Sequence, residues 1–179
     1  DPLRESVKGT VKQLVSAGIR LVLITGDHPD TAKSIATNAG IDVGDHGIVT
    51  GKDLDDMSDG ELQSRIALIS VFARVNPRHK VRIVQAWKGR DEVVAMVGDG
   101  VNDAAAMKVA DIGVALGSGT DVAQQTSDMV LLDNNLSTIV SAVREGRIIF
   151  DNIRKVIVYL LADSFSEIIL IGGAIALGL

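Results

Sequence analysis

The sequence has no cysteine, few aromatic residues and less positive than negative charge. Without cysteine the chain cannot form disulfides or metal sites built on thiolates, and its redox compartment is left open. Its 18 Lys and Arg are outnumbered by 23 Asp and Glu, for a formal net charge of −5, so no nucleic-acid partner is expected. Aromatic residues make up only 3%, whereas glycine occurs 18 times, which suits an α/β domain with tight turns.

The first residues also lack an initiator Met and the apolar stretch of a signal peptide, so we expect a piece of a longer polypeptide. With 179 residues, of which 46% are hydrophobic, the piece is long enough for one domain with a substantial core. The C-terminal end differs from the rest, because the sequence becomes strongly apolar after Lys155.

Apolar runs and helix-like segments alternate along the chain. Helices are expected where apolar residues have helical spacing or follow a proline or capping residue: 4–17, 29–39, 77–88, 101–110 and 120–127. Strands are expected at short β-branched runs: 19–25, 68–75, 93–99, 112–116 and 129–132, with a weaker one at 48–49. Residues 53–61 are interpreted as a solvated loop and the start of a helix. The alternation predicts an α/β fold with a doubly wound parallel sheet.

Polar chemistry is concentrated in the stretch MVGDGVND, where the strand expected at 93–99 ends. Asp99 is the first polar side chain beyond the apolar run, and Asn102 and Asp103 open the next helix. In open parallel sheets the functional groups gather at the carboxyl ends of the strands. Two carboxylates suit a hard cation such as Mg²⁺ and a helix N-terminus suits an anion, so together they suit a phosphate–Mg²⁺ site. The alternative is a polar turn in which Asp103 caps the helix.

Two earlier strand ends carry polar groups as well. Thr25, Gly26 and Asp27 follow the first strand, where a hydroxyl and backbone N–H groups can hold phosphoryl oxygens. Lys80 falls in the first turn of a helix, where an ammonium can neutralise phosphate charge. Each feature alone is equally well explained by an ordinary turn or a solvated lysine. A hydroxyl, a lysine and an acidic pair at three successive strand–helix junctions together favour a phosphate site.

At these motifs the chain resembles the haloacid-dehalogenase-like phosphotransferases and, more closely, the P-type cation-transporting ATPases of the calcium-pump type. The resemblance extends over nearly the whole chain and is carried by TGD, ARVNPRHK, MVGDGVNDAAAMKVADIGVALGSGTDVA and EGRIIFDNIRKVIVYLL. The opening DPLR resembles the hinge where that family's chain returns from its nucleotide-binding domain. The resemblance implies an incomplete Rossmann-like domain at 1–155, the C-terminal portion of a phosphorylation domain, and a transmembrane helix at 156–179.

The resemblance implies that several residues bind phosphoryl groups and ATP. Thr25 and Gly26 would bind the phosphoryl group, and Asp27 would lie on the nucleotide side. Lys80 would pair with a phosphorylated aspartate, and Arg74 would help to hold ATP near the hinge.

The same resemblance implies a magnesium site in the MVGDGVND stretch. Asp99 would be a direct Mg²⁺ ligand. Asn102 and Asp103 would hydrogen-bond around the phosphate and around the water molecules of the metal. Mg²⁺ and one lysine supply the charge neutralisation that phosphoryl transfer needs.

One motif of the family does not occur in the sequence. The nucleophilic aspartate of P-type ATPases lies in Asp-Lys-Thr-Gly-Thr, which is absent. We therefore expect the nucleophile, the first sheet strand, the nucleotide and actuator domains and most membrane helices to lie elsewhere in a longer polypeptide. This chain alone should not turn over ATP.

The apolar end, 156–179, is long enough for a membrane helix. Its 24 residues would span about 36 Å, against about 30 Å for a hydrocarbon core. Arg144, Arg147, Arg154 and Lys155 precede it. By the positive-inside rule these cations place the preceding domain in the cytoplasm. The alternative is an amphipathic core helix of a soluble protein.

Polar residues inside this segment predict a path for a transported cation. Asp163 and Glu167 are four positions apart with Ser164 beside them, and carboxylates inside a membrane helix are costly unless they serve a function. The resemblance matches Glu167 with a cation-ligating glutamate of the fifth helix of calcium pumps. Ser164 stands where those pumps usually have asparagine, and Asp163 is additional. Because these two residues depart from the calcium-pump pattern, we expect Ca²⁺ or a related cation rather than Ca²⁺ specifically.

Other functions remain alternatives at this point. A soluble phosphatase of the same superfamily would need Thr25, Lys80 and Asp99 but not the apolar tail. A dinucleotide-binding module is opposed by Asp103, which stands where a third glycine is required. A non-catalytic regulatory fragment is a third alternative. The histidines, His28, His46 and His79, are scattered, so no metal site is assigned to them.

Overall fold

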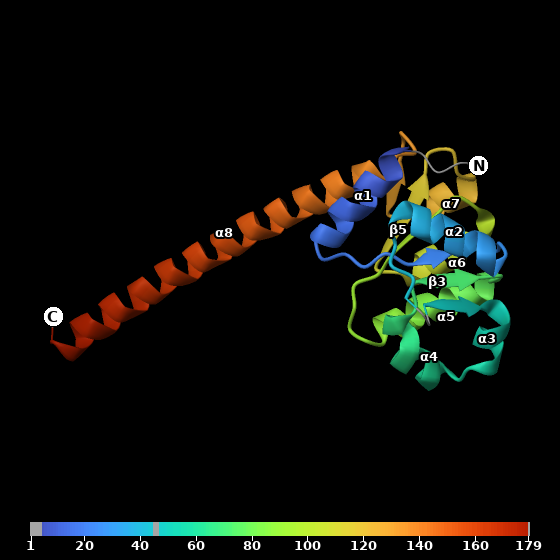
Figure 1. Cartoon of the computed structure of the whole chain (residues 1–179). Coiled ribbons are helices and arrows are strands. Elements are labelled where there is room, and N and C mark those ends of the chain that lie inside the picture. Colours follow the sequence, from blue (N-terminus) through green and yellow to red (C-terminus); the bar gives the residue numbers. More distant parts are fainter. Residues whose placement is uncertain (1–4, 45–46, 179) are drawn as a thin grey trace. The chain divides into compact units, whose positions relative to one another are not determined.

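The computed structural model describes residues 5–44 and 47–178 and divides the chain into two compact units, 1–138 and 139–179. Within the first unit, helices and strands alternate as expected (Figure 1). The DPLR stretch and His46 lie outside the described residues.

The helices of the first unit follow capping residues or prolines in most cases, as at Pro29 and Pro77. They are α1 (Glu5–Ser16), α2 (Pro29–Ala39), α3 (Gly51–Asp56), α4 (Asp59–Arg65), the 3₁₀ turn η1 (Ile66–Leu68), α5 (Pro77–Lys88), α6 (Val101–Val109) and α7 (Asp121–Thr126). The strands are β1 (Leu23–Ile24), β2 (Ile48–Thr50), β3 (Val71–Ala73), β4 (Ala95–Gly98), β5 (Ile112–Leu116) and β6 (Met129–Leu131).

The strands form two parallel three-stranded sheets, in the orders β1-β3-β2 and β4-β5-β6. The α/β parallel architecture is therefore confirmed. The sequence pattern predicted one sheet, whereas here β1 and β4 are both edge strands. Ile24 of β1 nevertheless packs against the hydrophobic clusters of both sheets, so the two sheets share a core contact.

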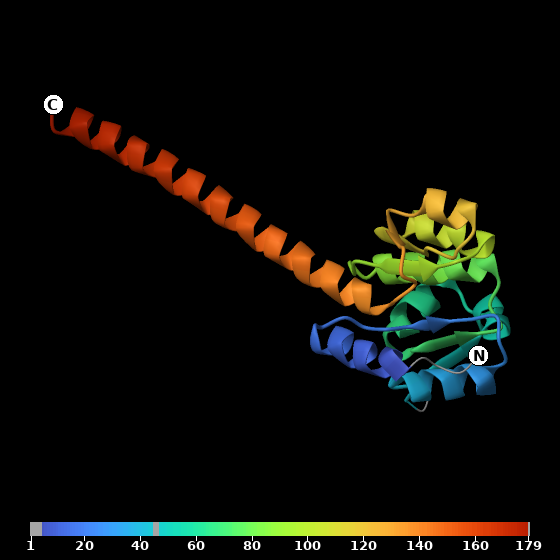
Figure 2. The ribbon, with the colours of Figure 1, turned by 90° about the horizontal axis from the view of Figure 1, so that it is seen from above.

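The first sheet is covered on both faces, as a doubly wound fold requires. On one face Val71 and Ala73 pack with Ala32 and Ala36 of α2. On the other face Phe72, which is fully buried, packs with apolar residues of α3, α4 and α5. Figure 2 shows the strands of this sheet between α2 and the green helices.

The second sheet packs one face against α6 and α7. Met96 and Ala115 are buried there with Ala106, Met107 and Ala123. On the opposite face Val97 is 36% and Ile112 is 40% exposed, although parallel strands are normally covered on both faces.

The segment between β2 and β3 differs from the prediction. Residues 53–61 were expected to be a loop followed by a helix start. The helix start agrees with α4, but residues 53–56 belong to the short helix α3 rather than to a loop. Thr50 and Asp53 form a capping box at the start of α3, and Ser58 caps α4 through the Glu61 N–H. Side-chain caps therefore offset the low helix propensity of this Asp-rich segment.

Figure 1 shows α8 (Ser137–Ala176) as one long helix. It has 40 residues, and none of its side chains is buried. Its most apolar window has a mean hydropathy of 1.8, so the helix is long and apolar enough to cross a membrane. It begins well before residue 156, because no helix-breaking residue separates the basic segment from the apolar one. Thr138 in its first turn donates to the Asp133 carboxylate over 2.7 Å.

The capping box of α3 gives a stability prediction. Hydrogen bonds from the Thr50 hydroxyl and the Thr50 N–H hold the pKa of Asp53 below its ordinary value of 3.8. We expect Asp53→Ala to lower the free energy of unfolding by about 1 kcal/mol at neutral pH. Because the pKa of Asp53 is lower in the folded state, the carboxylate stabilises the fold at pH values above its ordinary pKa. This stabilisation is lost as the pH falls through the lowered, folded-state pKa. The difference between the two proteins should therefore shrink in acid.

Denaturant unfolding at a series of pH values tests this expectation. The exposed Asp56, at the end of the same helix, supplies the control variant Asp56→Ala. A difference between wild type and Asp53→Ala that stays constant from neutral pH to about pH 2 contradicts the assignment of the effect to the carboxylate.

Candidate active site

The polar groups that follow β1 form a tight turn. The Thr25 hydroxyl donates to the Asp27 carboxylate over 2.9 Å and accepts from the Asp27 N–H over 3.1 Å. Gly26 and Asp27 are exposed. The carbonyl of Thr25 accepts from the Val75 N–H, which ties the turn to the end of β3. The exposed backbone of this turn is open to an anion.

Arg74 lies directly beyond β3 and beside this turn. Its N–H donates to the Asp27 carbonyl over 3.0 Å, so the predicted nucleotide-side residues are neighbours. Its φ of 52° is in the left-handed region, which is uncommon for a residue other than glycine. The carbonyl of Arg74 packs on Gly51, because a Cβ added to Gly51 would lie only 2.3 Å from the carbonyl oxygen. Strained backbone of this kind often occurs at functional sites.

The loop after β4 folds around Asp103. The carboxylate of Asp103 accepts from the Gly100 N–H over 3.4 Å, and the residue is 7% exposed. A Cβ on Gly98 would lie 2.4 Å from the Asp103 Cβ, so only glycine fits there. The glycines of GDGVND therefore let the second carboxylate pack directly against the loop that carries Asp99.

The backbone of Asp99 is fixed by the loop after β5. Its carbonyl accepts from the Thr120 N–H over 2.8 Å, and a Cβ on Gly119 would lie 2.9 Å from the same oxygen. The side chain of Asp99 is exposed, and among the described residues no hydrogen bond or ion pair to its carboxylate is found. Asn102, one turn further on, is also exposed.

Lys80 and Asp103 form an ion pair between α5 and α6. Lys80 Nζ lies 2.5 Å from Asp103 Oδ1, and the two side chains are 15% and 10% exposed. The pair joins residues that are 23 positions apart in the sequence. The structure thus brings Lys80 and the acidic loop together. In this structure the lysine is bound to Asp103, which the sequence did not predict.

The oxygen donors of this loop fit a magnesium ion. Within residues 5–44 and 47–178, no three His, Cys, Asp or Glu side chains gather closely enough to hold a metal by themselves. Mg²⁺ usually takes only one or two carboxylates and completes its shell with water and phosphate oxygens. Asp99 offers an exposed carboxylate, whereas both oxygens of Asp103 are already engaged. Asp99 is therefore the direct ligand that these contacts favour.

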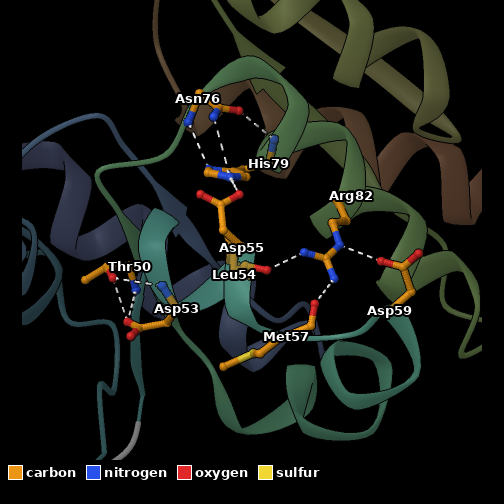
Figure 3. A network of polar contacts seen from close by, with 9 residues as sticks. All are labelled: Thr50, Asp53, Leu54, Asp55, Met57, Asp59, Asn76, His79 and Arg82. Carbon is orange, nitrogen blue, oxygen red and sulfur yellow. Dashed lines mark hydrogen bonds and ion pairs between the residues drawn. The ribbon is translucent and has the colours of Figure 1, made fainter.

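Figure 3 shows a polar network around His79 that the sequence analysis did not predict. His79 directly precedes Lys80 in the sequence. His79 Nε2 lies 2.8 Å from Oδ1 of Asp55 in α3, and its Nδ1 accepts from the Asn76 N–H over 3.2 Å. Asn76 in turn caps α5 by accepting from the His79 N–H over 3.0 Å. The pattern Asn-Pro-x-His is a recognisable helix start, but Asp55 is 24 positions away and its contact has no local signal.

Arg82 makes a second connection from α5 to the same segment (Figure 3). Its guanidinium donates to the carbonyls of Leu54 and Met57 and pairs with Asp59 over 2.5 Å. His79 and Arg82 are three positions apart, so they lie on the same face of α5.

The residues predicted to bind a transported cation all belong to α8. Asp163, Ser164 and Glu167 are exposed on one continuous helix, and the Ser164 hydroxyl donates to the Leu160 carbonyl over 3.0 Å. The predicted helical spacing is therefore confirmed. Their role stays a prediction.

Comparison with known families agrees with this geometry. The model of the haloacid dehalogenase-like hydrolases matches residues 1–111, and a second model of the same description matches residues 81–143. The chain belongs to the haloacid dehalogenase-like hydrolases. The membership accounts for the parallel strands with polar groups at their carboxyl ends.

Individual relatives of this haloacid dehalogenase-like chain are cation-transporting ATPases. A calcium-transporting ATPase of Listeria monocytogenes is 49% identical over 99% of the chain, and one of Bacillus cereus is 52% identical over 99%. The chain spans about one fifth of the length of these relatives. A crystal structure of a zinc-transporting PIB-type ATPase is 34% identical, with a TM-score of 0.67, over 87% of this chain and 21% of that chain. The resemblance to cation-transporting ATPases is thus confirmed.

Proposed function

We propose that this chain is the C-terminal portion of the phosphorylation domain of a P-type ATPase, followed by the start of a transmembrane helix. The observation that carries the proposal is the cluster formed by Lys80, Asp103 and the exposed Asp99. The similarity to calcium-transporting ATPases over 99% of the chain supports Ca²⁺ or a related cation as the transported ion. The proposed division places the phosphorylation domain at 1–155 and the membrane helix at 156–179.

The two edge strands support an incomplete domain. β1 and β4 each have only one hydrogen-bonded neighbour in the described sheets, and Val97 of β4 is partly exposed. Partly exposed apolar side chains on such a strand are unusual, because parallel sheets are normally covered on both faces. We propose that the missing strand lies between β1 and β4. It would come from the upstream part of the polypeptide and end in the nucleophilic aspartate of Asp-Lys-Thr-Gly-Thr.

The proposed chemistry is transfer of the γ-phosphoryl group of ATP to that upstream aspartate. An oxygen of the carboxylate attacks the phosphorus, the bond to the ADP oxygen breaks, and water later cleaves the acyl phosphate to release inorganic phosphate. Bound Mg²⁺ would polarise the phosphoryl oxygens and neutralise charge. Asp99 would hold the ion directly, and Asp103 and Asn102 would hold its water molecules and the phosphate.

The other residues of the site would position and neutralise the phosphoryl group. The Thr25 hydroxyl and the exposed Gly26 backbone offer donors at the end of β1. Lys80 carries three N–H donors, so it can contact a phosphoryl oxygen while it keeps Asp103 as a partner. Asp27 and Arg74, joined through their backbones, would bind ATP on the nucleotide side.

The helix α8 would connect this site with the membrane. We propose that its apolar part spans the bilayer, with the domain that precedes it in the cytoplasm. Glu167, Asp163 and Ser164 would bind the transported cation, since carboxylates within a bilayer are retained for function. The partners of this region are ATP, the cation, the lipid and the missing parts of the same polypeptide.

Asp99→Asn tests the magnesium assignment. In the full-length ATPase we expect the change to abolish Mg²⁺-dependent phosphoenzyme formation, because the direct anionic ligand is lost while the shape is kept. The measurement is incorporation of radiolabelled phosphate from ATP over a range of Mg²⁺ concentrations, with a melting curve to show that the variant folds. Normal phosphorylation of the folded variant would refute the assignment.

Glu167→Gln tests the cation path. We expect it to weaken activation of phosphorylation by the transported cation and to leave phosphorylation from inorganic phosphate intact. Glu167 is 30 positions beyond the start of α8, about 45 Å along the helix, so it cannot touch the phosphoryl group. Phosphoenzyme level against cation concentration is measured for Glu167→Gln, Asp163→Asn and the double variant. An unchanged cation dependence in the double variant would place the ion path elsewhere.

A further inference from the structure

The imidazole of His79 is buried at the point where α5 begins. Its side chain is 7% exposed and has a partner on each ring nitrogen, as Figure 3 shows. Because Nδ1 accepts the Asn76 N–H, the proton of a neutral ring lies on Nε2. Nε2 then donates to the Asp55 carboxylate. The longer approach of Asn76 Nδ2 to the same nitrogen, at 3.5 Å, is the weaker contact.

The imidazole ring also lies against the backbone of Gly51, where there is no room for a side chain. A Cβ on Gly51 would be 3.0 Å from the Cε1 and Nδ1 atoms of His79 and 2.3 Å from the Arg74 carbonyl. The first residue of α3 therefore packs directly on the imidazole and on the strained residue beyond β3. His79 thus contacts α3 and the cap of α5, and Gly51 connects these contacts with Arg74 beyond β3.

These contacts lie one residue before Lys80. The first turn of a helix has N–H groups without intrahelical partners and frays unless side chains hold it. Here the capping box of Asn76 and His79 holds that turn, and the His79–Asp55 hydrogen bond attaches it to α3. A carboxylate at this end is also favoured by the helix dipole. The side chain of Lys80 extends from the same turn and forms its ion pair with Asp103 of α6.

We propose that Asp55 and His79 are positioning residues for Lys80. They fix the first turn of α5 so that the lysine ammonium is held at the acidic loop, where the phosphoryl group is bound. The proposal rests on the proposed function of Lys80. Neither residue touches the phosphoryl group; Asp55 acts through His79, and His79 acts through the backbone that it shares with Lys80.

The test is the affinity of the full-length ATPase for inorganic phosphate, measured as phosphoenzyme formed from radiolabelled phosphate with Mg²⁺. We expect Asp55→Ala to weaken this affinity about tenfold, the scale of one charge-assisted hydrogen bond. Asp59→Ala is the matched control, because Asp59 is also an exposed carboxylate that binds α5, but through Arg82. Both changes remove one carboxylate contact to α5, yet only the first removes the contact to the turn of Lys80.

A double-variant cycle separates positioning from general stability. In a Lys80→Ala background, Asp55→Ala should cause no further loss of phosphate affinity, because its effect requires the lysine. Equal losses in Asp55→Ala and Asp59→Ala, or a full loss in the Lys80→Ala background, would overturn the proposal. Wild-type affinity in Lys80→Ala would overturn the proposed function instead.

Two substitutions of His79 keep the test valid if Asp55→Ala fails to fold. Glutamine places its amide near the position of Nε2 and can donate to Asp55, whereas asparagine reaches only the position of Nδ1. We expect His79→Gln to keep near wild-type phosphate affinity and His79→Asn to lose about as much as Asp55→Ala. Equal affinities in the two His79 variants would contradict a role for the Asp55 contact.

Discussion

The ion pair between Lys80 and Asp103 is the contact on which the site depends. It joins α5, which packs on the first sheet, to α6, which packs on the second. Removing one partner of a largely buried pair is costly, about 3–5 kcal/mol, because a desolvated charge is left behind. Before any anion binds, the pair therefore keeps the lysine ammonium at the loop that carries Asp99. In the proposed function this same ammonium becomes the partner of the phosphoryl group.

The surrounding backbone makes that pair possible. Gly98 leaves room for Asp103, and the loop after β5 fixes the Asp99 carbonyl through the Thr120 N–H. The cap of α5 and the hydrogen bond from His79 to Asp55 of α3 fix the backbone position of Lys80. Small residues and caps, rather than large side chains, thus determine where the charged groups lie. Phosphoryl transfer depends mainly on such positioning and on charge neutralisation.

The helices and strands were more predictable from the sequence than the tertiary contacts between them. The strand at 112–116 and the helices at 29–39 and 77–88 have the predicted bounds, because Gly, Pro and β-branched runs mark them locally. The helix α3 was missed, although Thr50 and Asp53 have capping-box spacing, because the Asp-rich composition outweighed that signal. The division into two sheets depends on strand pairing over long distances. The Asp55–His79 contact likewise joins residues 24 positions apart, and no periodic pattern in the sequence indicates it.

The central claim is that Asp99 binds the metal and Lys80 binds the phosphoryl group at the loop that follows β4. A crystal structure of the full-length ATPase with Mn²⁺ and a metal-fluoride analogue of phosphate tests it most directly, because the anomalous signal locates the metal. The account predicts a metal peak at the Asp99 carboxylate, with Lys80 Nζ within hydrogen-bond distance of the fluoride. A metal peak away from Asp99, or a fluoride that Lys80 does not reach, would contradict it.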